Sequence, residues 1–342
     1  MYQAFYRLKD YPFRLTPDPA YICFSAQHRE AFSGLVYSIC TRPGLAVLLG
    51  EAGTGKTTLL YALTDLLERR NYVLARCNNP TLSREEFYDV LLAELGVECS
   101  SSLKSRQLRA LEEALLRYRD AGRSAVLIVD EAQRLPLELL EENRLLLNLE
   151  TPREKLLQII MAGQPELGDT LGRPELRQLK QRVSAICRLG PLSVQELREY
   201  LQHRLARAGL PEQKLFPEEV IGLIYRYTQG IPRLVNSLCD AALRTGFALQ
   251  SPQITVAIIE EAVGDLELSD PDDVRAKKEL SNTDPPKVMP MPVVSPDAQS
   301  GQALPQNGLN GNRKVDVRIP LESYASRQRS LGFFGQLLDR WK

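Results

Sequence analysis

The sequence has little histidine, a single tryptophan and no excess of either charge sign. Among its 342 residues, Lys and Arg number 43 and Asp and Glu also number 43, so the formal net charge is +0. A neutral chain has no overall field to hold nucleic acid or an anionic membrane, so any such binding must be local. No stretch approaches the roughly 18 apolar residues of a membrane-spanning helix, and no basic stretch leads into an apolar run at the N-terminus. We therefore expect a cytoplasmic protein.

The cysteines also lack the spacing of a metal site. Six are scattered along the chain without a CxxC pair, and only 2 histidines are present to complete a zinc site. We expect reduced thiols that pack as small apolar side chains. With 44% hydrophobic and 25% charged residues, the composition is that of a globular chain and excludes a collagen-like or wholly disordered one.

Short apolar runs alternate with helical patterns up to about residue 268. This alternation predicts an α/β fold in which helices flank a mostly parallel sheet. Helix starts are marked by two capping boxes, Ser83 with Glu86 and Ser193 with Glu196. Five strands are expected, at residues 45–49, 72–76, 125–129, 156–162 and 186–189.

Beyond the last expected strand the pattern becomes helical only. We predict a leader and an α/β core in residues 1–190, a helical lid in residues 191–268, and hinges near Pro191 and Gly230. Residues 269–320 mix Pro, Gly, Ser and Asn with too few large apolar groups to offset the entropy of ordering, which predicts a disordered linker.

Residues 321–342 regain an amphipathic pattern. Five apolar side chains share one helical face near basic residues, although Gly332 and Gly335 weaken the helix. The alternatives for this segment are a partner groove, the inner face of a membrane, and the protein's own body. The apolar residues are Leu331, Phe334, Leu337, Leu338 and Trp341.

A phosphate-binding loop follows the first expected strand. Residues 50–57, GEAGTGKT, match G-x-x-x-x-G-K-[ST] between an apolar strand and a helical pattern. Glycines let backbone N–H groups close around phosphates, and the helix that begins there adds a partial positive charge. Lys56 is expected to reach the β and γ phosphates, and Thr57 to bind Mg²⁺. The predicted nucleotide-binding residues are Gly50, Glu51, Ala52, Gly53, Thr54, Gly55, Lys56, Thr57 and Thr58.

Two acids end the third expected strand. Asp130 and Glu131 follow five aliphatic residues, which places both carboxylates at the sheet edge where open α/β sheets bind ligands. Asp130 is the expected second Mg²⁺ ligand, and Glu131 is the expected catalytic residue that polarises the attacking water.

Several segments together resemble those of AAA+ ATPases, and more narrowly the ExeA family of general secretion pathway ATPases. They are Phe5-Tyr6, PFRLTPDP from Pro12, GEAGTGKTT, VDEAQ, AGQPEL from Ala162, LRQLKQRV from Leu176 and GIPRLVN from Gly230. The resemblance spans about residues 2–265. It implies a P-loop core with a parallel five-stranded sheet, an all-helical lid, ATP and Mg²⁺ as cofactors, and hydrolysis of ATP to ADP and phosphate.

The resemblance also implies roles for residues outside the loop. Gln164 resembles the polar sensor of the γ-phosphate, and Arg233 resembles the lid arginine that touches the nucleotide. Arg182 resembles the arginine finger that enters a neighbouring subunit's site, with Arg177 as the competing candidate. A homo-oligomeric ring is therefore expected. The leader around residues 12–19 is expected near the adenine, and both histidines are expected to be structural or solvent-facing.

The function implied is a motor or switch for an envelope secretion, pilus or exopolysaccharide-type system. Longer family members continue into a transmembrane helix and a peptidoglycan-binding domain, whereas here we expect a short form without them. The alternative is a nucleotide-gated DNA-binding regulator of the transposition or origin-binding type. The neutral charge and the lack of a helix-turn-helix pattern after the lid disfavour DNA as a partner.

Overall fold

The computed structural model describes residues 1–78, 81–210 and 215–270, which lie within one compact unit, Met1–Ala276. The amphipathic segment at 321–342 and nearly all of the linker expected at 269–320 lie outside the described residues. Among the helices of the described part, none is both long and apolar enough to cross a bilayer.

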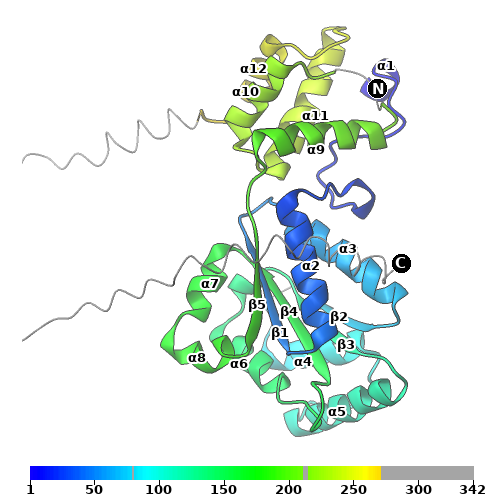
Figure 1. The fold of residues 1–342 in the computed structure, drawn as a ribbon, viewed down its shortest axis with the longest axis vertical. Helices are drawn as coiled ribbons and strands as arrows, with labels where there is room; N and C mark the ends of the chain where they lie inside the picture. The colour runs from blue at the N-terminus through cyan, green and yellow to red at the C-terminus, as the bar shows by residue number, and fades with distance from the viewer. Residues whose placement is uncertain (79–80, 211–214, 271–342) are drawn as a thin grey trace, which may run out of the picture. The chain divides into compact units, whose positions relative to one another are not determined.

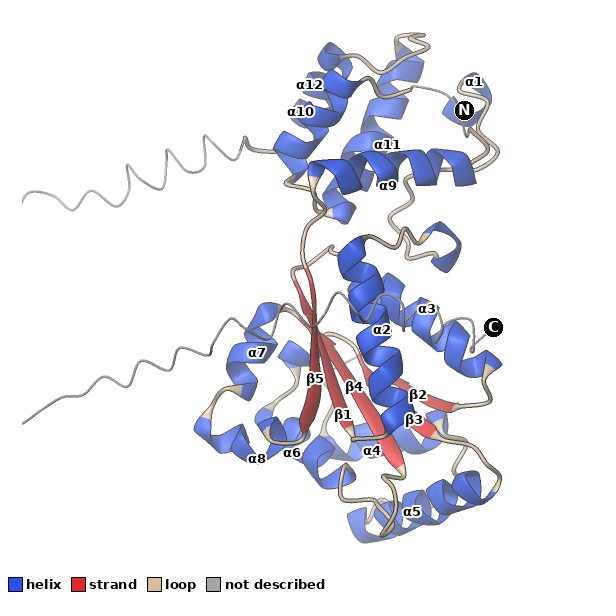
Figure 2. Ribbon diagram, in the orientation of Figure 1, coloured by secondary structure: helices blue, strands red, loops and turns tan. Residues whose placement is uncertain are grey.

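A parallel sheet forms the centre of the first part of the fold (Figures 1 and 2). Its order is β2-β3-β4-β1-β5, and every neighbouring pair of strands is parallel. The sequence prediction of a parallel five-stranded α/β sheet is confirmed. The strands are β1 Leu45–Gly50, β2 Val73–Cys77, β3 Ala125–Val129, β4 Leu157–Gly163 and β5 Val183–Leu189.

The position of each strand in the sheet explains its sequence pattern. Strands β1, β3 and β4 are buried along their whole length, as central strands covered on both faces must be. The edge strands β2 and β5 carry side chains that are only partly covered. The order also brings the carboxyl ends of β3, β4 and β1 next to one another.

Helices cover both faces of the sheet. Helices α2 (Ala26–Thr41) and α3 (Lys56–Arg69) lie on one face (Figure 1). The other face is covered by a continuous apolar cluster that includes residues from five helices. These helices are α4 (Arg84–Glu94), α5 (Lys104–Asp120), α6 (Leu137–Leu146), α7 (Pro165–Leu171) and α8 (Arg177–Lys180), with the short 3-10 turns η2 (Ala132–Arg134) and η3 (Pro174–Leu176) between them.

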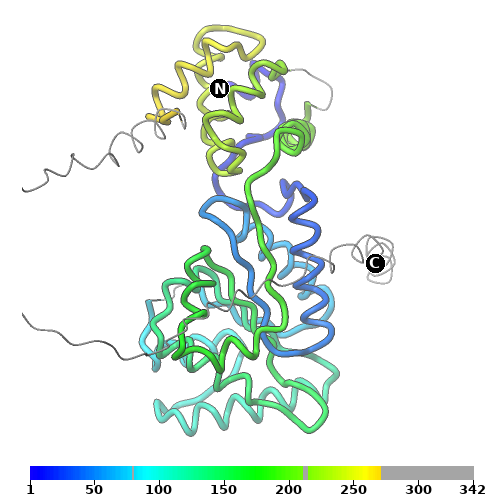
Figure 3. Tube along the Cα trace, turned by 60° about the vertical axis from the view of Figure 1, so that its left-hand side comes forward, coloured from blue at the N-terminus to red at the C-terminus, as the bar shows by residue number. Residues whose placement is uncertain are grey.

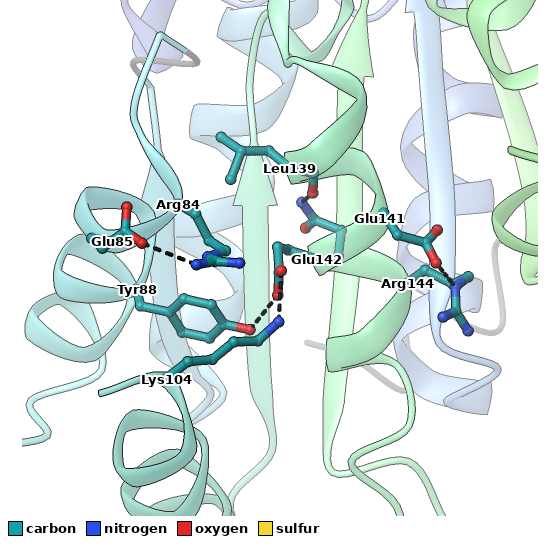
Figure 4. Close-up of polar contacts among 9 residues, drawn as sticks. Arg84, Glu85, Tyr88, Lys104, Leu139, Glu141, Glu142 and Arg144 are labelled. Atoms are coloured by element: carbon teal, nitrogen blue, oxygen red, sulfur yellow. Dashed lines mark hydrogen bonds and ion pairs between the residues drawn. The ribbon is translucent and has the colours of Figure 1, made fainter. Parts of the chain in front are cut away.

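A buried carboxylate joins three of these helices (Figure 4). Glu142 of α6 is 6% exposed and accepts hydrogen bonds from the Tyr88 hydroxyl of α4 at 2.8 Å and from Lys104 Nζ of α5 at 2.6 Å. Burial, followed by the contact with Glu142, raises the pKa of Tyr88. Because each helix supplies one member of the contact, their relative positions on this face are fixed by charge as well as by apolar packing.

A helical region follows the sheet, and no strand occurs among the described residues from 191 to 270. Both expected capping boxes are present, at Ser83 before α4 and at Ser193 before α9. Leu192 N–H donates to the Gly230 carbonyl at 2.9 Å, so the two expected hinge regions lie side by side. The helices are α9 (Val194–Arg207), α10 (Glu218–Thr228), α11 (Pro232–Ala248) and α12 (Val256–Asp265).

The N-terminal leader packs into this helical region (Figure 3). It starts with α1 (Tyr2–Phe5), and the Tyr2 hydroxyl donates to Asp240 Oδ1 at 2.6 Å. Phe13 is 1% exposed in the same apolar cluster as the helices. The leader then forms the 3-10 turn η1 (Pro19–Tyr21) and enters α2 beside the sheet. The leader therefore connects the helical core to the sheet, and the expected domain boundary at 190/191 stays a prediction.

Candidate nucleotide-binding site

The loop between β1 and α3 has the backbone that its glycines allow. Gly53 and Gly55 have φ angles of 82° and 99°, in the left-handed region that other residues rarely adopt. Gly55 precedes the first residue of α3, Lys56, so the helix N-terminus opens directly from the loop. Unpaired N–H groups and the helix dipole at such an end attract phosphate.

Lys56 is buried although it carries a charge. Its side chain donates from Nζ to the carbonyls of Gly50 at 2.7 Å and Glu51 at 3.0 Å. Burial lowers the pKa of Lys56, while the negative charges of Glu131 and Asp130 act in the opposite direction. A cation held by neutral carbonyls next to two acids can exchange those carbonyls for phosphate oxygens.

The two residues expected to hold a metal are in contact. Thr57 Oγ1 donates to Asp130 Oδ2 at 2.8 Å, and Asp130 is 7% exposed. The other carboxylate oxygen, Oδ1, accepts from Glu131 N–H at 2.9 Å. A hydroxyl and a carboxylate are hard oxygen ligands, so this pair fits Mg²⁺ rather than a softer metal.

Glu131 lies on the wall of the same cavity as the loop. Its backbone is left-handed at φ 54°, which turns the chain sharply after β3. The carboxylate accepts a hydrogen bond from Gln133 Nε2 at 2.7 Å. An acid at this cavity wall, close to the loop lysine, is suitably placed to orient a water molecule.

Helix α11 closes the cavity from the helical region. Arg233 N–H donates to the Gly53 carbonyl at 3.1 Å, so the first turn of α11 contacts the loop directly. The Arg233 side chain is exposed and lines the cavity together with Asn236, one turn further along. Asn236 Oδ1 accepts from the Tyr200 hydroxyl of α9 at 2.9 Å.

The leader also lines this cavity, whose volume is about 360 Å³. Residues 14–17 and 21–23 line it. Arg204 of α9, which is 8% exposed, donates to the Pro12 carbonyl at 2.8 Å and lies over the rings of Tyr21 and Tyr200. The leader is thus held against the helical region where it borders the cavity.

His28, in the first turn of α2, contacts the backbone of the phosphate-binding loop. Its Nε2 lies 3.2 Å from the Thr54 carbonyl, and its Nδ1 lies 2.8 Å from Ser25 Oγ. Because a carbonyl can only accept, Nε2 carries the proton and the neutral ring accepts at Nδ1. Burial lowers the pKa of His28, which favours that neutral form, although the Thr54 contact and the charge of Glu196 oppose the shift.

Most residues predicted from the sequence lie together. Gly50, Glu51 and Thr54 belong to the same loop, and Asp130 contacts it through Thr57. Those that line the cavity are Ala52, Gly53, Gly55, Lys56, Thr57, Thr58, Glu131 and Arg233.

Gln164, Arg182 and Arg177 lie neither in the loop nor on the cavity wall. Gln164 directly follows β4, between the strands that lead to the loop and to the acids. Arg182 NH2 donates to Asn148 Oδ1 at 3.2 Å before β5, and Arg177 is exposed on α8. Neither arginine is part of this chain's own cavity wall.

The sequence gives little indication of the residues from the leader and α9. His28 lies 26 residues before its partner Thr54, and Arg204 lies 192 residues after its partner Pro12. Spacing within one helix or loop cannot reveal such contacts. The nearest sequence signal is the Ser25 cap, since Ser25 and His28 share one helix turn.

The fold and the loop geometry define the class of protein. Residues 40–171 match the family model described as an AAA domain. The chain is therefore similar to members of the AAA+ family of P-loop NTPases.

More narrowly, the chain is similar to General secretion pathway protein A of Aeromonas hydrophila. The two are 39% identical over 255 residues, which is 74% of this chain and 46% of the relative. The chain therefore spans less than half the length of that curated relative.

Solved structures show the same fold. A chain of Drosophila ORC bound to DNA has a TM-score of 0.60 at 18% identity, covering 80% of this chain and 67% of that chain. Cdc6p from Pyrobaculum aerophilum has a TM-score of 0.56 at 16% identity, covering 77% of this chain and 70% of that chain. At these identities the likeness concerns the fold alone.

Proposed function

We propose that this protein binds and hydrolyses Mg-ATP, and uses the cycle to drive or switch the assembly of an envelope secretion, pilus or exopolysaccharide-type system. The observation that carries the ATPase proposal is the arrangement around one cavity. The loop, the Thr57–Asp130 contact, Glu131 and Arg233 approach it from three parts of the chain. The relative in the general secretion pathway supports the proposed setting.

The residues of this chain suit phosphoryl transfer to water. The loop amides and Lys56 would hold the phosphates, and Thr57 and Asp130 would hold Mg²⁺, which when bound neutralises phosphate charge. Glu131 would orient a water and take its proton as the water oxygen bonds to the γ-phosphorus and the bond to the β-phosphate oxygen breaks. Arg233 would contact the nucleotide from α11.

The first experiment combines calorimetry with phosphate-release assays on the purified chain. Wild type should bind ATP with Mg²⁺ and release phosphate. Lys56→Ala should weaken binding at least about tenfold, because the phosphate charge loses its buried partner. Glu131→Gln should keep binding within about threefold and lose about 100-fold or more in kcat, because only the water is left unoriented.

Two exposed residues on neighbouring helices provide matched controls. Lys180→Ala on α8 and Glu138→Gln on α6 make the same chemical changes away from the cavity. Both should behave as wild type. Absence of nucleotide heat with wild type, or equal heat with Lys56→Ala, would contradict the proposal.

The setting can be tested with the Glu131→Gln variant held in its ATP state. For an assembly ATPase, gel-shift assays at a series of salt concentrations should show no ATP-dependent binding of duplex DNA. ATP-dependent binding with a steep salt dependence would instead favour the DNA-binding regulator.

Co-sedimentation with anionic vesicles, compared with a chain that ends at residue 320, tests the proposal that the C-terminal segment binds the inner face of a membrane.

A further inference from the structure

Gln133 connects the expected catalytic acid to another strand of the sheet. It lies in η2, two residues after Glu131, and is only partly exposed. Its Nε2 donates to Glu131 Oε2 at 2.7 Å. Its Oε1 accepts from the backbone N–H of Gln164, at the junction of β4 and α7, at 3.1 Å. One side-chain amide therefore joins the carboxyl end of β3 to the carboxyl end of β4.

The chemistry of its two partners fixes the orientation of this amide. A backbone N–H can only donate, so it must face the amide oxygen. The amide NH₂ then faces Glu131, whose ionised carboxylate can only accept. A rotated amide would lose both hydrogen bonds and place its oxygen against a carboxylate. The contact therefore requires glutamine, since a glutamate at this position would place a second negative charge next to the Glu131 carboxylate.

The backbone around the amide leaves room for this approach. A Cβ atom at Gly163 would lie 2.7 Å from Gln133 Oε1 and 3.2 Å from Gln133 N, closer than side chains normally allow. The absence of a side chain at Gly163 therefore permits the η2 turn to sit against the end of β4. Glu131 itself has a left-handed backbone, with φ 54°, so the chain turns sharply between β3 and Gln133.

We propose that Gln133 is a positioning residue for hydrolysis, which holds the Glu131 carboxylate in line with the end of β4 through the Gln164 N–H. The inference rests on the proposed ATPase function and adds a residue to it. A shift at the β4–α7 junction is transmitted to the carboxylate through this amide. Gln133 does not line the cavity, so nucleotide affinity does not depend on it.

The test measures kcat, KM and their pH dependence in the full chain. Gln133→Met keeps the side-chain length and removes both hydrogen bonds, so kcat should fall about 10- to 100-fold while KM for ATP stays within about threefold. Gln133→Glu should move the acidic limb of the pH–kcat profile to higher pH, because two adjacent carboxylates lose protons less readily than one. A merely structural role would not produce that shift.

Gln195 on α9 provides the matched control. Its Nε2 donates to Glu199 Oε1 at 3.1 Å, so it makes the same Gln–Glu contact on an exposed surface away from the cavity. Gln195→Glu should leave the pH profile unchanged. Calorimetry with ATP on every variant reports whether the nucleotide site is folded.

The outcomes separate the inference from the function on which it rests. If wild type hydrolyses ATP and Glu131→Gln does not, but both Gln133 variants match wild type in kcat and pH profile, the role of Gln133 is overturned and the ATPase stands. If wild type does not hydrolyse ATP, both proposals fall together.

Discussion

Gly53 is subject to two separate constraints, one on its backbone and one on its surroundings. Its φ of 82° strains any other residue, and a Cβ there would lie 2.7 Å from Arg233 Cβ. We expect Gly53→Ala to destabilise the protein by about 2–5 kcal/mol, since left-handed backbone costs about 1–2 kcal/mol and overpacking about 1–3 kcal/mol more. ATP affinity should fall at least about tenfold, as measured by calorimetry, because the loop must move away from α11.

Gly96 separates the two constraints. It also has a positive φ, of 67°, but nothing lies within 4 Å of a Cβ there. Gly96→Ala should therefore cost only about 1–2 kcal/mol in urea unfolding and leave ATP affinity unchanged. Equal losses of stability and affinity in both variants would show that the contact with Arg233 is unimportant.

The lowered pKa of His28 predicts a pH dependence. Because the pKa is below its ordinary value of about 6.5, the folded state favours neutral His28. Its contribution to stability is complete above pH 6.5 and is lost as the pH falls below that value. Denaturant unfolding should show wild type more stable than His28→Gln by about 1 kcal/mol at pH 7.5 and by less at pH 5.5.

His203 is the matched control because it does not line the cavity. ATP affinity at pH 7.5 should decrease in His28→Gln, whose loop support is altered, and stay unchanged in His203→Gln. A pH-independent stability difference for His28→Gln would contradict the assigned neutral form.

At the scale of elements, the Glu142 contact predicts an asymmetric cost. Lys104→Met removes the cation and leaves a carboxylate buried beside Tyr88, which should cost about 2–3 kcal/mol in denaturant unfolding. Adding Glu142→Gln removes the stranded charge and should recover part of that loss. The ion pair between Arg109 and Glu113, with side chains 82% and 55% exposed, provides the control.

Arg109→Met should change stability by only about 0–0.5 kcal/mol, because water screens an exposed i,i+4 pair. If the double variant Lys104→Met/Glu142→Gln is no more stable than Lys104→Met alone, the buried charge is not the source of the loss.

The sequence predicts elements well where a local pattern determines them. Strands β1, β3 and β4 are predicted because burial on both faces requires continuous apolar residues. The start of β5 is predicted three residues late. This is an edge strand, and its first side chains alternate between partly buried and exposed, so they form no continuous apolar run. The phosphate loop and the acids are equally local. The positions of Arg204, Gln133 and the leader residues that line the cavity depend on contacts between separate segments. A local sequence pattern does not predict such contacts.

For the whole molecule, the cavity wall is built from segments that belong to both apolar cores. The loop and Glu131 extend from the sheet, whereas Arg233, Arg204 and part of the leader belong to the helical region. A ligand that contacts both parts stabilises the conformation in which they lie together, because it binds that conformation more tightly than others. Nucleotide binding is therefore expected to restrict motion between the sheet and the helical region.

The position of Arg182 leads to a prediction about assembly. It lies outside this chain's own cavity wall, with NH2 on Asn148, so a role in catalysis requires that it act on a neighbouring copy. Arg182→Ala should keep ATP affinity and lose at least about 1000-fold in kcat. Mixing it with Glu131→Gln, which keeps the arginine, should restore activity because some interfaces then combine an intact site with an intact finger.

The amount of restored activity identifies the arginine. Random 1:1 assembly gives an intact pair at about one quarter of the interfaces, so phosphate release should reach about one quarter of the wild-type rate per interface. The same mixture made with Arg177→Ala decides between the two candidates, since only the finger variant loses activity alone and regains it on mixing. If neither mixture gains activity and the wild-type rate per subunit is independent of concentration, each chain hydrolyses ATP alone and the expected ring is wrong.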